Sequence, residues 1–332
     1  GESVLIGVLV TGVMVAFFYF AKKKVSASWL NTIMMMITVM LMGYSSYAVI
    51  MIRSSANPTM DQNSPDNVFA LKYYLNREQY GDRPLLYGET FNAPPKVVQD
   101  ENGQYAYDLV KKKMYAPKPK TDPNEKDKYV VTGYKMSIRK NDKFMVLFPR
   151  MYSDEPMHIS GYKMWGEVKG SPVSYEIAGE EKTEMRPTFI ENLRFFVDYQ
   201  VVFMYWRYFM WNFSGRQNDI QGNGEIEHGN WITGINLIDN LLVGDQSNLP
   251  TELKNNKGRN TYFLLPFLLG VLGIFFLLNT NKKGTESFWI TLLLFLMTGL
   301  AIVLYLNQPP YQPRERDYDY AGSFYAFSIW IG

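Results

Sequence analysis

Long uncharged apolar runs constrain this chain more strongly than any other feature. Four of them occur in its 332 residues, at 4–21, 29–52, 261–278 and 288–306. Each is close to the ~20 apolar residues that an α-helix needs to cross a bilayer. Trp29, Trp289 and Tyr305 lie near the ends of these runs, as aromatic residues do at membrane interfaces. The pattern predicts four membrane-spanning helices, and the alternative is four buried helices of a soluble protein.

The two ends of the chain are typical of an internal piece of a longer multi-pass protein. Residue 1 is Gly, and the apolar stretch 323–332 resembles the start of a fifth spanning helix. The sequence therefore predicts an α-helical integral membrane protein with about four spanning helices plus a truncated fifth. Between the second and third runs we expect a mixed α+β extracytoplasmic domain.

Lysines in the short links between the runs predict the orientation of these helices. Residues 22–24 are three lysines, and Lys282 and Lys283 follow the third run. Cytoplasmic loops carry an excess of Lys and Arg. The short links are therefore expected in the cytoplasm, and residues 53–260 and the chain after residue 306 outside it.

Composition excludes several classes of site. The chain has no Cys, which excludes disulfides, Cys-zinc sites, iron–sulfur clusters and thiol catalysis. It has two His residues, too few for a multi-His metal centre. Lys and Arg number 34 against 32 for Asp and Glu, which argues against a nucleic-acid partner. No nucleotide-binding glycine motif is present, so a soluble nucleotide enzyme is not expected.

Four regions follow from these runs: 1–52, 53–260, 261–306 and 307–332. In the second region, Ser64 and Pro65 predict the start of a helix at about 65–80. A β-rich module is expected at about 82–170, and its expected strands are 84–88, 104–109, 129–138 and 143–148. Hairpin turns are expected at Asn102-Gly103 and at 140–142.

The segment at about 189–213 is unusually aromatic and also carries four charged residues. At a helical period, Phe196, Tyr199, Phe203 and Trp206 share one face. This pattern predicts a helix that lies in the membrane interface, followed by a polar loop at 214–260. A core helix of the outside domain is the alternative.

Two arginine-bearing motifs follow apolar segments on the same predicted side of the membrane. The first includes Arg216, Gln217, Asn218 and Asp219, and the second, at 313–318, includes Arg314, Glu315, Arg316, Asp317 and Tyr318. The two acids of the second motif could instead pair with its arginines. Arginine binds phosphate in a bidentate manner, and a lipid phosphate would lie at this depth. The two motifs, with Arg207 behind them, are therefore candidates for a lipid-phosphate site. The alternative is that both are ordinary polar loops.

A divalent-cation site is a weaker alternative at the first motif. Glu225, Glu227 and His228 follow Asp219 on a glycine-rich loop. The sequence indicates no cofactor, and no residue is assigned as a metal ligand.

Several stretches of the chain together resemble a family of uncharacterised bacterial multi-pass membrane proteins related to protein O-mannosyltransferases. They are SPDNVFALKYYLNREQYGD at 64–82, PLLYG at 84–88, WNF at 211–213, GRQND at 215–219 and QPRERDY at 312–318. The resemblance implies a glycosyltransferase of the C type in the bacterial inner membrane, with its large loop on the periplasmic side. Such an enzyme transfers a sugar from a polyprenyl-phosphate carrier to the hydroxyl group of an acceptor protein.

The family's catalytic acid belongs to an Asp-x-Gly-Glu type of sequence, which this chain lacks. The catalytic residue is therefore unknown and expected outside this fragment. For the residues that remain, fixed guanidinium groups would stabilise the charge on the leaving lipid phosphate. Two rival functions are a non-catalytic membrane scaffold of a cell-envelope secretion or assembly system, and a lipid or glycan transporter. The uncharged runs argue against the transporter.

Overall fold

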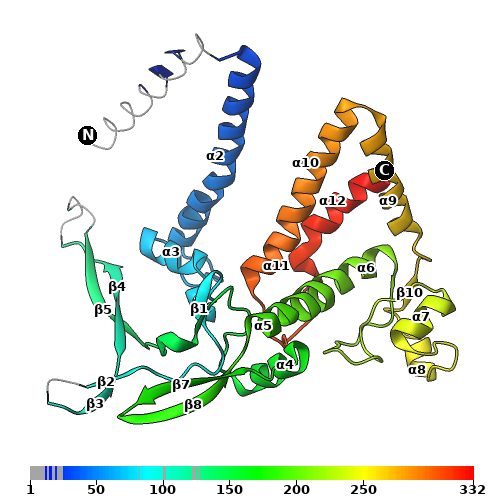
Figure 1. The fold of residues 1–332 in the computed structure, drawn as a ribbon. Coiled ribbons are helices and arrows are strands. Elements are labelled where there is room, and N and C mark those ends of the chain that lie inside the picture. The colour runs from blue at the N-terminus through cyan, green and yellow to red at the C-terminus, as the bar shows by residue number, and fades with distance from the viewer. Residues whose placement is uncertain are drawn as a thin grey trace. The chain divides into compact units, whose positions relative to one another are not determined.

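The computed structural model describes residues 12, 15, 16, 19 and 20, and residues 25–332 except 82, 100, 101, 122–124, 126 and 127 (Figure 1). The chain divides into two compact units. Unit 1 comprises residues 1–82 and 112–135, and unit 2 comprises residues 83–111 and 136–332.

Unit 1 contains the long apolar helix α2 (Ala27–Ser55), whose residues are almost all exposed. The shorter helix α3 (Val68–Leu75) follows it. The N-cap of α3 is Asn67 and not Ser64, because the Asn67 Oδ1 atom accepts hydrogen bonds from the backbone N–H groups of Phe69 and Ala70. The predicted helix at 65–80 is thus shorter, and a 3₁₀ turn, η1 (Glu78–Tyr80), follows the left-handed residue Arg77.

Strands β4 (Leu109–Pro117) and β5 (Tyr129–Ile138) pair with each other. Their outer parts belong to unit 1, where the ring of Phe69 on α3 lies 4.8 Å from that of Tyr115 and 4.7 Å from that of Tyr129. Strand β5 occupies the range that the sequence predicts for it.

Unit 2 contains four small antiparallel sheets among the described residues. The pairs are β1 (Tyr87–Glu89) with β6 (Met145–Leu147), β2 (Val97–Gln99) with β3 (Tyr105–Tyr107), β7 (Ser171–Ile177) with β8 (Glu180–Arg186), and β9 (Gly215–Arg216) with β10 (Asn260–Thr261). The turn predicted at 140–142 does not make a hairpin of β5 and β6. A 3₁₀ turn, η2 (Asp142–Phe144), intervenes, and β6 pairs with β1 instead.

One continuous helix forms the centre of unit 2. It consists of α5 (Phe189–Phe195), the π-helix η3 (Phe196–Trp206) and α6 (Arg207–Phe213). Thr188 and Glu191 form a capping box at its start. Most of its aromatic side chains are buried, and the shorter helix α4 (Pro156–Gly166) packs against it. This burial favours the core-helix alternative over a helix lying in the membrane interface.

The remaining helices of unit 2 lie towards the C-terminus. They are α7 (Asn236–Val243), α8 (Thr251–Lys254), α9 (Leu265–Thr280), α10 (Lys282–Thr298), α11 (Leu300–Leu306) and α12 (Ala321–Ile331), with the 3₁₀ turn η4 (Asp317–Tyr320) before α12. Helices α9, α10 and α12 pack side by side (Figure 1). At Gly273 of α9, an added Cβ atom would overlap the carbonyl oxygen of Trp330, so only glycine allows this approach.

The predicted four-span fold class is wrong. In the part of the chain that the structure describes, two helices are long and apolar enough to cross a membrane, α2 and the continuous stretch Lys282–Leu306. The third predicted span is the 16-residue helix α9, which is shorter than a span needs. The first predicted span, at 4–21, lies largely outside the described residues. The described chain is instead a mixed α+β protein in which much of the C-terminal apolar sequence packs against other helices.

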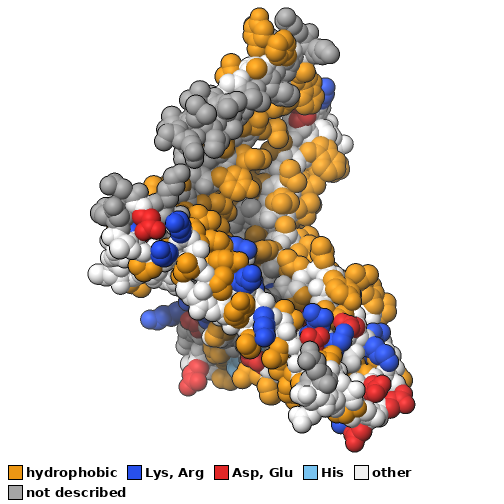
Figure 2. Space-filling model, turned by 90° about the vertical axis from the view of Figure 1, so that its left-hand side faces the viewer, with side chains coloured by type: hydrophobic (Ala, Val, Ile, Leu, Met, Phe, Trp, Pro, Cys, Tyr) orange, Lys and Arg blue, Asp and Glu red, His pale blue; other side chains and the backbone are white. Residues whose placement is uncertain are grey.

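Apolar side chains are nevertheless exposed on several helices, and many hydrophobic side chains are visible in orange on the face drawn in Figure 2. In unit 2, Phe275 and Phe276 of α9 are each about two-thirds exposed, and Ile290 of α10 is 72% exposed. Burial of the apolar residues of α9 and α10 within the protein is therefore only partial.

Hydrogen bonds from Arg83, Arg150 and Asn307 join the end of α11 to the segments that flank β1 and β6. The Arg83 Nη1 atom donates to the carbonyl oxygen of Leu306 at 2.9 Å, and the Arg150 Nη1 atom donates to that of Leu304 at 3.0 Å. The side chain of Asn307 donates to the carbonyl oxygens of Pro84 and Pro149. The β1–β6 region is thereby fixed to the C-terminal end of the apolar helix Lys282–Leu306.

Candidate functional site

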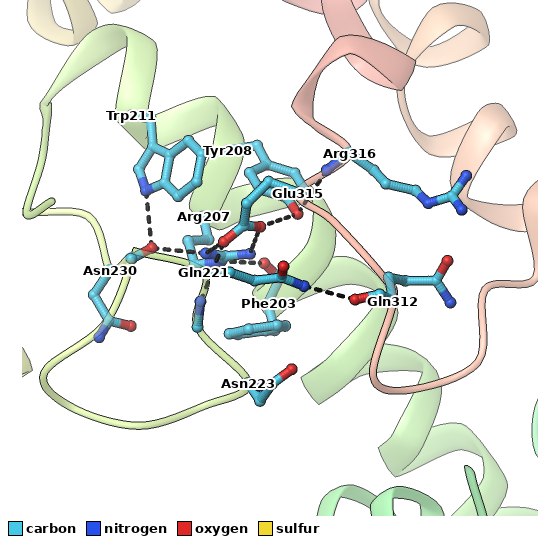
Figure 3. Close-up of polar contacts among 12 residues, drawn as sticks. Phe203, Arg207, Tyr208, Trp211, Gln221, Asn223, Asn230, Gln312, Glu315 and Arg316 are labelled. Carbon is cyan, nitrogen blue, oxygen red and sulfur yellow. Dashed lines mark hydrogen bonds and ion pairs between the residues drawn. The ribbon is translucent and has the colours of Figure 1, made fainter. Parts of the chain in front are cut away.

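A buried ion pair joins the central helix to the segment after α11. Arg207 is 3% exposed, and its Nη2 atom lies 2.8 Å from the Oε2 atom of Glu315. Its Nη1 atom donates to Glu315 Oε1 and to the carbonyl oxygen of Gly229, and its Nε atom donates to that of Phe203. Figure 3 shows the guanidinium group among these partners. Arg207 thus binds its own helix and two segments more distant in the sequence, at Gly229 and at Glu315.

Glu315 is held by further donors as well as by Arg207. The hydroxyl group of Tyr208 donates to its Oε2 atom, and the backbone N–H of Gly222 donates to its Oε1 atom at 3.3 Å. The Tyr208 oxygen in turn accepts a hydrogen bond from the backbone N–H of Arg316 at 3.1 Å. Burial raises the pKa of Tyr208 well above its ordinary value, so the hydroxyl keeps its proton and remains a donor.

Aromatic rings contact Arg207 and Arg216. We call these two residues, together with Arg314 and Arg316, the arginine cluster. The Cζ atom of Arg207 lies 4.1 Å from the ring centre of Phe203 and 4.8 Å from that of Trp211. The Cζ atom of Arg216 lies 3.9 Å from the ring centre of Trp211. The Trp211 indole N–H donates to the same Gly229 carbonyl that Arg207 binds. Cation–π contacts therefore add to the ion pair.

Gln217 and Asn218 of the first motif are buried and fix the loop at 220–230. The amide of Gln217 donates to the carbonyl oxygen of Ile226 and accepts from Asn230. The amide of Asn218 donates to the carbonyl oxygen of Glu227 and accepts from the N–H groups of Ile220 and Gly229. Their polar atoms already have partners in the chain, so these two residues position the loop.

Arg216, Arg314 and Arg316 differ from Arg207 because they lack a counter-charge. Among the described residues, no carboxylate oxygen lies within 4.0 Å of their guanidinium nitrogens. The Arg216 Nε atom donates to the carbonyl oxygen of Asn218, Arg314 lies over the ring of Tyr318, and the side chain of Arg316 points away from Glu315 (Figure 3). None of these three arginines is therefore paired with a carboxylate within the described part of the chain.

The remaining predicted site residues lie at the edges of this cluster. Asp219 is exposed and accepts a hydrogen bond from the side chain of Asn256. Asp317 and Tyr318 begin η4, and Tyr318 is half exposed. In the described part of the chain, no group of three His, Asp or Glu residues could hold a metal ion, so Glu225, Glu227 and His228 are not gathered with Asp219 around one point.

A narrow recess opens beside the ion pair, between η3, the 221–223 loop and the 312–315 segment. Gln221 crosses it and donates to the carbonyl oxygen of Gln312 at 2.6 Å (Figure 3). The recess has room for about one water molecule, so a larger ligand has to bind at its open rim. Arg314 and Asn223 lie at this recess.

Sequence reasoning did not identify Glu315 and Tyr208 as the partners of Arg207. Glu315 stands in the second motif between two arginines, and Tyr208 follows Arg207 directly. A carboxylate so close to an apolar segment could have suggested a buried partner for Arg207. The separation of 108 residues between the two charges conceals it.

Comparisons with known proteins give one match, to part of the chain. The model of a family of unknown function (DUF8416) matches residues 81–197, which include β1 to β8, α4 and α5. No curated protein and no solved structure matches the chain. The resemblance to protein O-mannosyltransferases thus stays a prediction.

Proposed function

We propose that this chain is part of a bacterial membrane glycosyltransferase of the C type, in which Arg216, Arg314 and Arg316 bind the phosphate of a polyprenyl-phosphate sugar donor. The observation that carries the proposal is the contrast within the arginine cluster. Arg207 has a carboxylate partner, whereas these three guanidinium groups have none among the described residues. An anion that reaches the cluster would supply the missing counter-charge.

The position of the cluster along the chain supports a lipid-linked anion. The segment that carries Arg314 and Arg316 follows Leu306, the last residue of an apolar helix long enough to cross a membrane. If that helix spans the bilayer, these arginines lie close to its surface, where the phosphate of a lipid carrier lies. Arg207 and the amides of Gln217 and Asn218 would then hold the cluster in shape.

The catalytic role in this proposal stays with residues outside the cluster. Glu315 accepts hydrogen bonds from Arg207, Tyr208 and Gly222, so its oxygens are engaged and it is a poor general base. The arginines would act on the leaving group: negative charge develops on the lipid phosphate as the glycosidic bond breaks, and fixed guanidinium groups stabilise it. The acceptor would be a protein hydroxyl.

A sugar-transfer assay tests this proposal. The full-length protein in detergent receives a polyprenyl-phosphate sugar and a cell-envelope protein extract, and mass spectrometry detects glycosylated products. We expect Arg216→Ala and Arg314→Ala each to lower the rate about tenfold or more, because each removes a charge-assisted contact. Arg194→Ala is the matched control, since Arg194 is exposed and paired with Glu167 outside the cluster.

Absence of transfer with several sugar donors, by a protein that is folded and bound to lipid, would contradict the enzyme proposal. A rate that falls as much in Arg194→Ala as in Arg216→Ala would contradict the role of the cluster. Absence of transfer would leave the membrane scaffold as the better explanation, because the Arg207–Glu315 pair is as suited to holding a structure together as to supporting a site.

A further inference from the structure

A cavity on unit 2 lies far along the chain from the arginine cluster. It has a volume of about 270 Å³. Strand β6 and residues 186–189, where β8 leads into α5, form most of its lining. It shares no residue with the recess at Arg207 and Glu315. We refer to this cavity as the β6 groove.

Strand β6 presents an unused edge. In the β1–β6 ladder, the backbone N–H of Phe148 donates to Leu86, and that of Thr90 donates to Phe144. Paired residues of an antiparallel ladder alternate between bonded and non-bonded pairs, so Gly88 and Val146 form the bonded pair between these two. The backbone groups of Leu147 and the carbonyl group of Met145 therefore point away from β1. Such an edge is a template for another strand.

Arg186 supplies an uncompensated positive charge at this groove. Its Nη1 atom donates to the carbonyl oxygen of Lys143 at 2.6 Å, and its buried Nε atom has no hydrogen-bond partner. Among the described residues, no carboxylate oxygen lies within 4.0 Å of the guanidinium group. Arg186 is also the charged residue in the lining of the groove. A ligand with a carboxylate at this position would complement it.

The other polar groups at the groove are already engaged, and its rim is apolar. Buried Asn192 accepts from the backbone N–H of Arg150 and donates to the carbonyl oxygen of Phe148, and Thr90 donates to Asn92. Leu147 is 70% exposed and Phe189 is 57% exposed. Recognition at this site thus depends on main-chain hydrogen bonds, apolar contacts and one positive charge.

We propose that the β6 groove binds an extended peptide segment, which adds a strand to the β1–β6 sheet and places an Asp or Glu side chain against Arg186. Main-chain bonds to a strand edge give affinity in this mode of recognition, and pockets for alternate side chains give specificity. The free edge of β6 and the guanidinium group of Arg186 both line this cavity, so one strand with a single acidic side chain can contact both. This inference goes beyond the proposed sugar transfer and holds without it.

Fluorescence anisotropy tests the proposal with the full chain in detergent. The probe is a labelled pool of ten-residue peptides that alternate apolar residues with Thr and have a fixed central Glu. We expect the pool to bind, and Gln in place of the Glu to weaken binding about tenfold. Two further pools carry a methyl group on every second peptide nitrogen, one on the odd-numbered and one on the even-numbered residues. Each removes half of the main-chain N–H donors of the peptide, so at least one of the two pools is expected to lose binding. These comparisons leave the protein unchanged.

Two variants locate the binding to the groove. Leu147→Pro removes an N–H that faces away from β1 and is expected to weaken binding about tenfold. Tyr107→Pro is the matched control, because the backbone N–H of Tyr107 likewise faces away from its partner strand β2. Arg186→Gln is expected to equalise the affinities for the Glu and Gln pools.

Three results would overturn the proposal. They are no binding of any pool by the folded protein, equal binding of the methylated and unmethylated pools, and an equal effect of Leu147→Pro and Tyr107→Pro. None of these results depends on sugar transfer, so failure here and failure of the proposed function are distinguishable.

Discussion

Two buried arginines of unit 2 are held in different ways. Arg207 has the carboxylate of Glu315, whereas Arg150, which is 1% exposed, has the carbonyl oxygens of Leu304 and Leu85 and the ring face of Phe148. Burial lowers the pKa of Arg150 to about 10. The comparison shows that a buried cation can be balanced by a full charge or by the partial negative charge at the C-terminal end of a helix.

The two solutions differ in what the removal of a partner leaves behind. Loss of Glu315 leaves Arg207 charged and buried, which is among the costliest changes in a protein interior. Loss of Arg150 leaves neutral carbonyl groups without a donor, at a smaller cost. Three predictions follow, from the largest expected effect to the smallest, and the first two use this difference.

Glu315→Ala is expected to lower the free energy of unfolding by about 3–5 kcal/mol, because it leaves the buried Arg207 charge without a carboxylate partner. Denaturant unfolding in detergent measures it. The double variant Arg207→Met/Glu315→Leu removes both charges and should recover most of the loss. A double variant less stable than Glu315→Ala would show that the unpaired Arg207 charge is not the cause of the lost stability.

Arg150→Met is expected to cost about 1–3 kcal/mol, since two carbonyl oxygens lose a donor while a desolvated charge is removed. The same unfolding experiment measures it, with Arg194→Met as the exposed control. A loss larger than that of Glu315→Ala would reverse the order of the two regions and break the comparison.

The smallest expected effect is a dependence of stability on pH that arises from His158. Burial lowers the pKa of His158, and nearby Arg83 lowers it further, although Glu155 opposes this. A lowered pKa means that the unfolded chain takes up a proton first. Stability is therefore full above the ordinary His value of about 6.5 and falls as the pH drops below it, by about 1 kcal/mol or less. Unfolding at a series of pH values measures this slope.

His158→Gln should flatten the slope, because the variant has no imidazole to protonate. An unchanged slope in this variant would assign the pH dependence to other groups. The Nδ1 atom of His158 lies 2.8 Å from the hydroxyl oxygen of Ser153, which also accepts a hydrogen bond from the backbone N–H of Glu155. Ser153→Ala is a second variant, which keeps the imidazole and removes both hydrogen bonds.

Local patterns in the sequence predicted local structure well. Strand β5 has the bounds that its Tyr- and Val-rich sequence predicts, and the apolar run at 29–52 lies within α2. Patterns that depend on distant partners were less informative. Strand β6 was expected after a hairpin turn, but its partner β1 lies more than 50 residues earlier in the chain.

The wrong four-span prediction has a similar cause. Apolar content alone does not separate a helix that faces lipid from one that packs against neighbours, and α9 packs against α10 and α12. For the candidate site, the sequence indicated which arginines to consider but not which of them has a carboxylate partner. Only the folded chain distinguishes Arg207, paired with Glu315, from Arg216, Arg314 and Arg316, which have no carboxylate partner in the described chain.

The π-helix within the central helix affects the rotation of α6 about the helix axis relative to α5. Wide turns place more residues in each turn than the ~3.6 of an α-helix, and a π-helix continues for eleven residues here, from Phe196 to Trp206. Deleting one residue within it would rotate α6 relative to α5 by roughly a quarter of a turn. Arg207 would then turn away from Glu315 while the capping box at Thr188 stayed in place. The number of residues in the π-helix therefore determines the direction in which Arg207 points.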